Sequence, residues 1–391
     1  MSGEACPAVL SWLREREGEM VALLDELVRA ESPSLVPGAE GEALDLITEE
    51  LSAAGYLSRR IRGHETGDHL FARPKGRHRT GGYQLVVGHV DTVWPLGSIR
   101  QMPTRRDNGR FYGPGAYDMK GGLTQLVYAL RALHELVLGP ALTPVIFVNS
   151  DEEVGSADSA RYVRLLARGA HRALVLEPPA GPEGALKTGR KGVGRFQLAV
   201  RGRAAHAGTS PEAGLSAILE LSYLIQELFA LNDPERGVTV NVGTIDGGLG
   251  PNVVAPEATA MVDVRAPTQA AASRVTQAIR SLKPNRPGIS VSVNGRFGRP
   301  PMQRTARNRA LCRRAQRLGA DLGLDIDEAP VVGGASDANL TSSLTATLDG
   351  LGPVGAGAHA PDEHVLVSAL PERAALLALL LLEPPRPELR V

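Results

Sequence analysis

The sequence predicts an α/β protein: a mostly parallel β-sheet with helices on both faces, interrupted by a smaller inserted domain. Short apolar segments alternate with amphipathic helical segments over the first half of the chain, which is typical of a covered, mostly parallel sheet. This rhythm changes near residue 194 and returns after Arg299-Pro300-Pro301. Because single cores stop growing at about 250–300 residues, we expect two domains: residues 1–193 with 305–391, and the inserted residues 194–304.

The larger domain is predicted to open with helices and to continue as alternating strands and helices. The helix expected after residue 121 carries apolar residues about every 3.6 positions, as one buried face requires. A last apolar run, residues 374–382, follows Pro371 and is too short to span a bilayer, so we expect a closing core helix. The expected helices are 6–30, 41–54, 121–138, 156–168, 308–322 and one from about 336; the expected strands are 83–88, 145–149, 173–176 and 345–348.

The inserted domain is predicted to have a βαββαβ order. Phe196, Leu198 and Val200 alternate with polar neighbours, as in a strand with one exposed face. A helix (214–231), two strands (238–245 and 258–264), a helix (269–282) and a strand (289–293) follow. This order is the ferredoxin-like arrangement, which leaves one sheet face open and an edge strand able to pair with a second copy.

Composition and charge exclude several functional classes. Lys plus Arg and Asp plus Glu both number 43, so no global charge points to nucleic acid or to a membrane surface. The first 20 residues are charged and have no apolar core, unlike a signal peptide. Cys6 and Cys312 are too few for a disulfide framework, which favours a reducing cytoplasmic location.

The functional prediction starts from Gly88-His89-Val90-Asp91-Thr92-Val93, where the 83–88 strand ends. In open α/β sheets, ligands bind at the carboxyl edge of the strands. Imidazoles and carboxylates without thiolates suit zinc, cobalt or manganese, and two divalent ions usually share a bridging carboxylate. Four further segments offer such groups: Asp118-Met119-Lys120-Gly121-Gly122, Asp151-Glu152-Glu153, Glu177-Pro178-Pro179 and His359.

Each of these residues also has a simpler interpretation when taken alone. Asp118 can cap the helix that begins near Gly121, and Glu152 and Glu153 can favour the N-terminus of the next helix. A single histidine at a strand end is more often not a metal ligand. The metal-site prediction therefore depends on the whole set lying at one sheet edge.

Together these segments resemble the M20 family of dinuclear metallopeptidases, specifically its glutamate carboxypeptidase (carboxypeptidase G2-like) branch. The resemblance covers about residues 87–365. It rests on Gly-His-Val-Asp-Thr-Val, Tyr-Gly-Pro-Gly-Ala-Tyr-Asp-Met-Lys-Gly-Gly, Asp-Glu-Glu-Val-Gly-Ser and the late Gly-Ala-His. It implies a zinc-peptidase-like catalytic domain with an inserted lid that also forms a dimer interface.

The resemblance assigns metal-site roles to seven residues. His89 and Glu177 would hold one ion, Glu153 and His359 the other, and Asp118 would bridge them. Asp91 would orient the ring of His89, as carboxylates behind metal-binding histidines do. Glu152 would be the general base that takes a proton from a metal-bridging water. The resemblance also implies a cis peptide bond between Asp118 and Met119.

The resemblance places substrate contacts in the inserted domain and in one later loop. His206 would reach a partner subunit's site and support the oxyanion, Asn252 would contact substrate, and Arg265 would clamp its free carboxylate. Taken alone, His206 can be an exposed loop residue and Arg265 part of a surface salt bridge. Gly334, in Gly333-Gly334-Ala335-Ser336-Asp337, would line the pocket.

We therefore expect a cytoplasmic, homodimeric hydrolase with two divalent ions, zinc first and cobalt or manganese as alternatives. Its substrate would be a small molecule or peptide with a free carboxylate, cleaved next to a C-terminal, glutamate-like amino acid. An N-acyl-amino-acid deacylase of the acetylornithine or succinyl-diaminopimelate type is the closest alternative, because the same metal site serves both. An inactive metal-binding relative and a two-metal phosphoesterase are weaker alternatives. Nucleic acid and membrane are not expected as partners.

Overall fold

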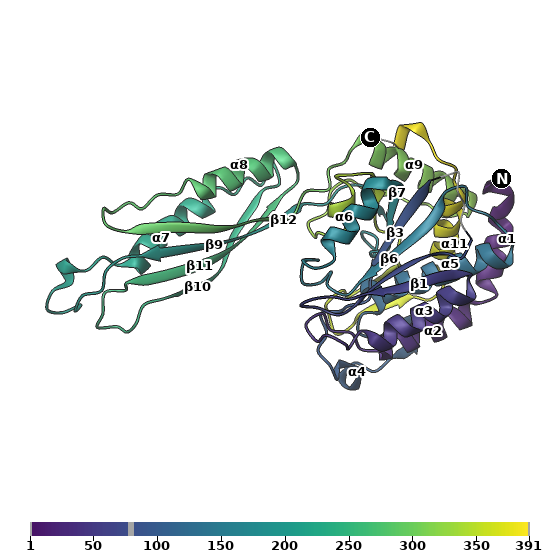
Figure 1. Ribbon diagram of the computed structural model, residues 1–391, viewed down its shortest axis with the longest axis horizontal. Coiled ribbons are helices and arrows are strands. Elements are labelled where there is room, and N and C mark those ends of the chain that lie inside the picture. Colours follow the sequence, from purple (N-terminus) through teal and green to yellow (C-terminus); the bar gives the residue numbers. More distant parts are fainter. Residues whose placement is uncertain (1, 77–81, 390–391) are drawn as a thin grey trace. The chain divides into compact units, whose positions relative to one another are not determined.

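A computed structural model describes residues 2–76 and 82–389 of the chain, which divides into two compact units (Figure 1). Unit 1 comprises Met1–Thr188, Arg304–Val332 and Ser336–Val391, and unit 2 comprises Gly189–Gln303 and Gly333–Ala335. The inserted unit thus begins at Gly189 rather than at residue 194, and it includes the short stretch Gly333–Ala335.

A six-stranded sheet in the order β1-β2-β6-β3-β7-β14 forms the centre of unit 1. Its strands are β1 (Tyr56–Ile61), β2 (His69–Pro74), β3 (Tyr83–His89), β6 (Thr143–Asn149), β7 (Ala170–Val175) and β14 (Ala346–Leu348). Neighbours from β6 to β14 run parallel, which confirms the predicted sheet. β2 pairs antiparallel with both β1 and β6. Neither strand was predicted; β1, at the edge of the sheet, is only partly buried and gives a weak apolar signal.

Helices cover both faces of this sheet (Figure 1). The chain passes from β3 through α5 to β6 on one side, then through α6 back to β7 on the other side of β3. Because such crossovers are right-handed, α5 and α6 lie on opposite faces. The helices are α1 (Ser2–Arg14), α2 (Glu17–Arg29), α3 (Gly41–Ala53), α4 (Ser98–Gln101), α5 (Gly121–Glu135), α6 (Ala160–Gly169), α9 (Ala306–Asp321), α10 (Ala338–Thr341) and α11 (Ala369–Leu382).

Two of these helical regions bear directly on the predictions. The helix expected over residues 6–30 is two helices, because Arg16 leaves the helical conformation with φ −110° and ψ 15°. α11 is buried over most of its length, which confirms the closing core helix. Among the described residues, no helix combines the length and apolar character needed to cross a bilayer. Cys6 and Cys312 are buried free thiols.

Two small sheets complete unit 1. One contains β8 (Leu186–Lys187) and β13 (Glu328–Ala329); the other, in the order β15-β16-β5-β4, contains β4 (Arg105–Asp107), β5 (Arg110–Tyr112), β15 (Gly355–Ala356) and β16 (His364–Leu366). In the second sheet, His364 of β16 lies opposite Tyr112 of β5. This pairing places the loop before β16 beside the loop after β5.

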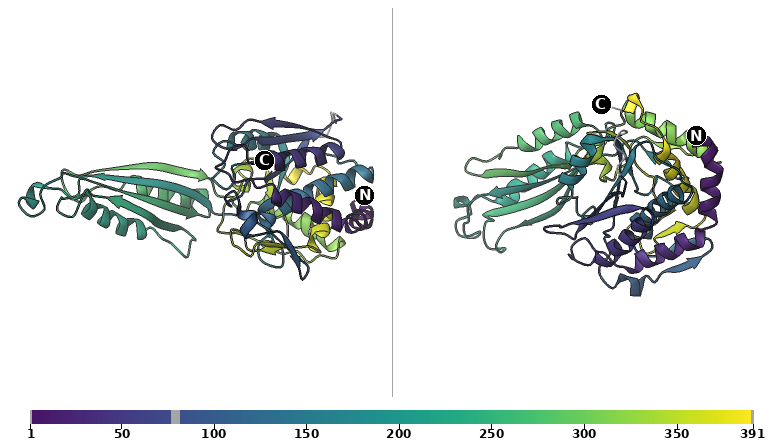
Figure 2. Two further views of the ribbon diagram at one scale, coloured as in Figure 1. Left: turned by 90° about the horizontal axis from the view of Figure 1, so that it is seen from below. Right: turned by 45° about the vertical axis from the view of Figure 1, so that its right-hand side comes forward.

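Unit 2 has the predicted βαββαβ order (Figure 2). Its elements are β9 (Gly192–Arg201), α7 (Ala217–Phe229), β10 (Thr239–Gly247), β11 (Glu257–Ala266), α8 (Gln269–Arg280) and β12 (Ser290–Arg299). The strands form an antiparallel sheet in the order β10-β11-β9-β12, with β10 and β12 at its edges. Ser216 and Thr268 cap the two helices by accepting backbone N–H groups. Both helices pack on the sheet around a separate apolar core.

Candidate active site

The candidate residues of unit 1 meet where the parallel strands β6, β3 and β7 end. His89 is the last residue of β3 and lies opposite Asn149, the last residue of β6. Glu177 follows β7 by two residues, because that strand ends at Val175. The chain leaves β3 toward β6 on one side and returns to β7 on the other, so this edge is a topological switch point, where ligands bind in such sheets.

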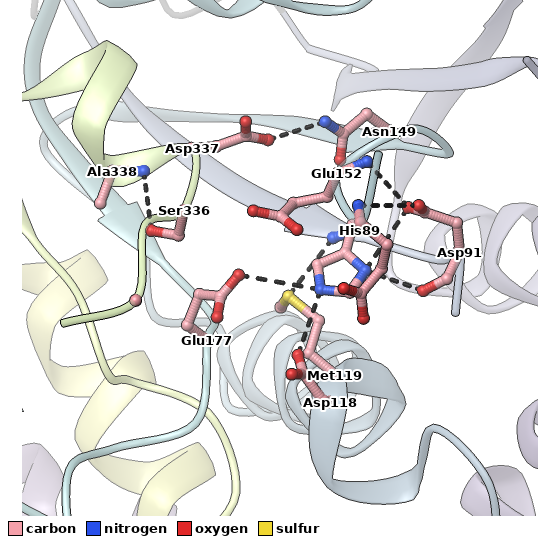
Figure 3. A network of polar contacts seen from close by, with 12 residues as sticks. His89, Asp91, Asp118, Met119, Asn149, Glu152, Glu177, Ser336, Asp337 and Ala338 are labelled. Atoms are coloured by element: carbon pink, nitrogen blue, oxygen red, sulfur yellow. Dashed lines mark hydrogen bonds and ion pairs between the residues drawn. The ribbon is translucent and has the colours of Figure 1, made fainter. Parts of the chain in front are cut away.

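Asp118 lies between the two histidines of the site. Its Oδ1 is 3.3 Å from Nε2 of His89, and its Oδ2 is 3.6 Å from Nε2 of His359. Nε2 of His89 is also 3.7 Å from Oε1 of Glu177, and Nε2 of His359 is 3.2 Å from Oε1 of Glu153. The peptide bond between Asp118 and Met119 is cis. Each oxygen of the Asp118 carboxylate therefore faces a different imidazole, and each imidazole has a second carboxylate beside it. Figure 3 shows the His89 side of this arrangement, with Asp118 and Glu177 next to the ring.

These distances and donor types fit divalent metal ions. Two ligand atoms about 2.0–2.1 Å from a tetrahedral zinc ion are about 3.3–3.4 Å apart, close to the 3.2–3.7 Å that separates the imidazole and carboxylate atoms. Ligand atoms of His89, Glu152 and Glu177 lie within 4.8 Å of one another, as do those of His89, Asp118 and Glu153. The residues present thus have the spacing and the nitrogen and oxygen donors of a carboxylate–imidazole metal site.

The charges of this cluster also favour a bound cation. Burial lowers the pKa of His89, but hydrogen bonds to Asp118 and Asp91 outweigh it and hold that pKa well above 6.5. Burial alone would raise the pKa of Asp118, whereas the hydrogen bond and charge of His89 bring it below 3.8. The proton on His89 therefore occupies the place where a metal ion would bind, and metal binding must release it.

Asp91 is buried at 1% exposure and holds two parts of the site together. Nδ1 of His89 lies 2.9 Å from the backbone oxygen of Asp91 and 3.5 Å from its Oδ1, so the carbonyl is its nearer partner. The carboxylate accepts the backbone N–H groups of Glu152 (3.2 Å) and Glu153 (3.1 Å) and the hydroxyl of Ser34 (2.6 Å). Asp91 thus orients the ring through its main chain and holds the loop of Glu152 and Glu153 through its side chain.

Glu363 is a residue of this site that the sequence reasoning missed. Its carboxylate is 1% exposed and accepts the backbone N–H groups of Gly115 (2.8 Å), Tyr117 (2.9 Å) and Asp118 (3.0 Å) and Nε1–H of Trp94 (2.9 Å). Burial raises its pKa to about 7, although these hydrogen bonds act in the opposite direction. Because Glu363 shares the 357–363 loop with His359, it fixes that loop against Asp118. The signal in the sequence was a carboxylate four residues after the late histidine.

Asp337 is a second residue that the sequence reasoning missed, and it contacts Asn149 near Glu152 (Figure 3). Its Oδ2 accepts Nδ2–H of Asn149 at 2.7 Å, and its Oδ1 accepts the hydroxyl of Ser156 at 2.5 Å. Asn149 and Ser156 flank Glu152 and Glu153. Asp337, at the end of the Gly-Gly-x-x-Asp segment, therefore holds residues on both sides of the Glu152–Glu153 pair.

The candidate substrate residues His206, Asn252, Arg265 and Gly334 all belong to unit 2. His206 is exposed, and its Nδ1 accepts the N–H groups of Gly208 (3.1 Å) and Thr209 (3.2 Å), which leaves Nε2 as the donor. A backbone bridge joins His206 to Val253, so His206 and Asn252 come from neighbouring segments. Nε and Nη2 of Arg265 donate to the two carboxylate oxygens of Asp263, at 2.7 and 3.2 Å. The carbonyl of Gly334 accepts from Arg190 at 3.2 Å.

Comparison with known proteins agrees with this site. A family model described as "Peptidase family M20/M25/M40" matches residues 85–383, which is most of the chain and includes every candidate residue above. This chain belongs to that family. It is accordingly a hydrolase of the M20 metallopeptidase and amidohydrolase type, with the mixed α/β fold of its M20 relatives.

Within the M20 family, the chain is similar to proteins of different named activities. It is 28% identical to carboxypeptidase G2 of Pseudomonas sp. (strain RS-16) over 94% of this chain and 90% of that protein. It is 29% identical to succinyl-diaminopimelate desuccinylase of Verminephrobacter eiseniae (strain EF01-2), over 86% and 90%. It shares its fold with Bacillus subtilis YxeP, described as a dinuclear metal-binding M20 peptidase, with a TM-score of 0.69 at 16% identity over 94% and 98% of the two chains.

Proposed function

We propose that this chain uses two divalent metal ions, zinc first and cobalt or manganese as alternatives, to hydrolyse an amide bond next to a C-terminal, glutamate-like amino acid. The observation that carries the proposal is the placement of Asp118, whose two oxygens face His89 and His359 separately. One bridging carboxylate with an imidazole and a further carboxylate on each side is the ligand pattern of a two-metal hydrolase. Glu177 would complete one ion's ligands and Glu153 the other's.

Glu152 would be the general acid and base. Bound divalent ions lower the pKa of a coordinated water and polarise a carbonyl oxygen. Glu152 is 7% exposed, and its carboxylate lies within 4.8 Å of the ligand atoms of His89 and Glu177. From there it can accept the proton of the attacking water and donate it to the leaving nitrogen. Asp91, through the N–H of Glu152, would keep that carboxylate in place.

Unit 2 would supply the substrate contacts. Nε2–H of His206 and the side chain of Asn252 would stabilise the oxyanion and the substrate amide. Arg265 would release the carboxylate of Asp263 and bind the free carboxylate of the substrate in its place. Gly334 would allow the substrate to approach the backbone closely.

We also propose a homodimer formed through unit 2. β10 pairs only with β11 and forms one edge of the unit 2 sheet, and Ile245 (60%), Leu249 (77%) and Phe229 (48%) are exposed in this unit. Such an edge and such apolar side chains favour pairing with a second copy. Sedimentation equilibrium tests this, because a monomer at all concentrations would exclude it.

A deacylase of N-acyl amino acids is the second candidate function. The similarity to a succinyl-diaminopimelate desuccinylase covers almost as much of the chain as that to carboxypeptidase G2. Both reactions cleave an amide beside a carboxylate, so the same metal site and the same arginine would serve either. Only the shape of the substrate pocket distinguishes them.

The testing experiment is hydrolysis of a mixed panel by the zinc- or cobalt-loaded protein, followed by mass spectrometry. The panel combines N-acyl amino acids, including N-succinyl compounds, with peptides and conjugates that end in glutamate. Glu152→Gln should lower kcat by about 10²–10⁴-fold with unchanged metal content, whereas exposed Glu183→Gln should match the parent protein. The preferred panel member identifies the branch. Full activity in Glu152→Gln would remove this residue from the mechanism, and a loss of metal would make it a ligand.

A further inference from the structure

A second cluster of charged residues lies away from the metal-site candidates, where α9 meets β7 and the end of α11. α9 carries five arginines in 16 residues. Three of them line a cavity of about 130 Å³, together with Arg172 of β7 and Arg386. η3 (Pro387–Leu389), at the end of the described chain, packs against α9 and closes one side. The charged lining residues are Arg172, Arg313, Arg314, Arg317, Arg386, Glu383 and Glu388.

The two carboxylates do not balance these guanidinium groups. Glu383 is held by a two-pronged contact from Arg314 and lies 3.5 Å from Arg386. Glu388 is 55% exposed and reaches Arg386 only at 3.8 Å. Arg313 and Arg317 are exposed and have no ion-pair partner within residues 2–76 and 82–389. Five cations therefore face two anions around one small cavity.

Arg172 is the least expected member of the cluster, because it is 1% exposed. Its Nε donates to Oε1 of Gln84 (2.9 Å), and its Nη2 donates to the carbonyls of Leu380 (2.9 Å) and Glu383 (2.7 Å). These partners are neutral, and Nη1 has no hydrogen-bond partner in the described part of the chain. Glu383 is the one carboxylate whose charge acts favourably on Arg172, and Arg314 and Arg386 share that carboxylate. Because a buried charge that shares its counter-charge is costly, an anion in the adjoining cavity would stabilise Arg172.

We propose that this cavity binds a phosphate-sized anion, either inorganic phosphate or the phosphoryl group of a small monoester. A volume of about 130 Å³ corresponds to roughly four water molecules, which is enough for a tetrahedral oxyanion. It is well below the ~300–1,000 Å³ of sites that enclose larger organic ligands. Guanidinium forks match the oxygens of a phosphoryl group in pairs, and Arg313 and Arg317 have their donors available.

Calorimetric titration of the metal-loaded protein with sodium phosphate tests the proposal, with sodium chloride at equal ionic strength as the reference. We expect saturable binding and a higher melting temperature in phosphate. Arg313→Gln/Arg317→Gln should weaken binding at least about tenfold, since two charge-assisted contacts are lost. Arg164→Gln/Arg168→Gln on α6 removes the same charge at the same spacing outside the cavity and should bind like the parent protein.

Two results would overturn the site. Phosphate binding that is unchanged in Arg313→Gln/Arg317→Gln would place the anion elsewhere, including at the metal ions. No heat and no stabilisation beyond those in chloride would make the cluster a solvated basic face. Because both arginines are exposed, the double variant should fold, and single Arg317→Gln provides a milder check. Equal affinity for glycerol phosphate would identify a phosphoryl ester site, whereas binding of inorganic phosphate alone would identify a free-anion site.

Discussion

The metal-site candidates of unit 1 and the substrate candidates of unit 2 are held in very different ways. Around the metal site, His89, Asp91 and Glu363 are 1% exposed, and their hydrogen bonds connect segments far apart in the chain. In unit 2, His206 and Asn252 are exposed, and the side-chain bonds of His206 reach only two and three residues along the chain. The metal-site candidates are thus pre-organised by buried contacts, whereas the substrate candidates are held by local contacts in a unit of their own.

Removal of the metal ions should have the most different effects on the two regions. Without ions, the carboxylates of Asp118, Glu152, Glu153 and Glu177 lie close to one another around His89, and like charges so close repel. Chelation should abolish activity and speed amide exchange in residues 115–120, 150–156 and 357–363, but not in residues 205–210 or 250–254 of unit 2. Zinc should restore both properties. Equally faster exchange in the two units would show that the ions stabilise the whole chain instead.

Glu363→Gln tests whether the buried network sets the metal affinity. All four partners of Glu363 are N–H donors, so an amide of the same shape turns its NH₂ toward two of them. Residues behind metal ligands typically contribute about 10–100-fold in metal affinity, and we expect a loss of that size in a metal competition titration. Glu40→Gln is the matched control, since Glu40 is 5% exposed and accepts the N–H groups of Gly38 and Asp68 at 2.8 Å. Equal metal affinity in both variants would contradict the network's role.

The contrast between contacts that are local in the chain and contacts between distant segments also explains which features could be predicted from the sequence. The fold followed from apolar periodicity, and the candidates His89, Asp118 and Glu177 were found because they follow strands or precede a helix within a few residues. Glu363 could not be found this way. Its contact with Asp118 depends on β16 pairing with β5, and the two residues are 245 positions apart in the chain. β1 was missed for a related reason, because a partly exposed edge strand has little apolar signal of its own.

Arg265 offers the smallest expected effect and the sharpest test of unit 2. Its guanidinium group binds Asp263, and both side chains are about one-third exposed (32% and 35%). Such an ion pair contributes only about 0.2–1 kcal/mol to stability, so it can open for a substrate carboxylate. Arg265→Gln should raise KM about tenfold with little change in kcat, since one charge-assisted contact is lost.

Two comparisons separate this role from a merely structural one. Asp263→Asn frees the fork and should leave KM unchanged or lower, although it breaks the same ion pair. A substrate whose terminal carboxylate is replaced by a carboxamide should show no further penalty in Arg265→Gln. If both variants instead lower the melting temperature equally and leave KM unchanged, Arg265 only stabilises unit 2, and the free carboxylate must be bound by another residue.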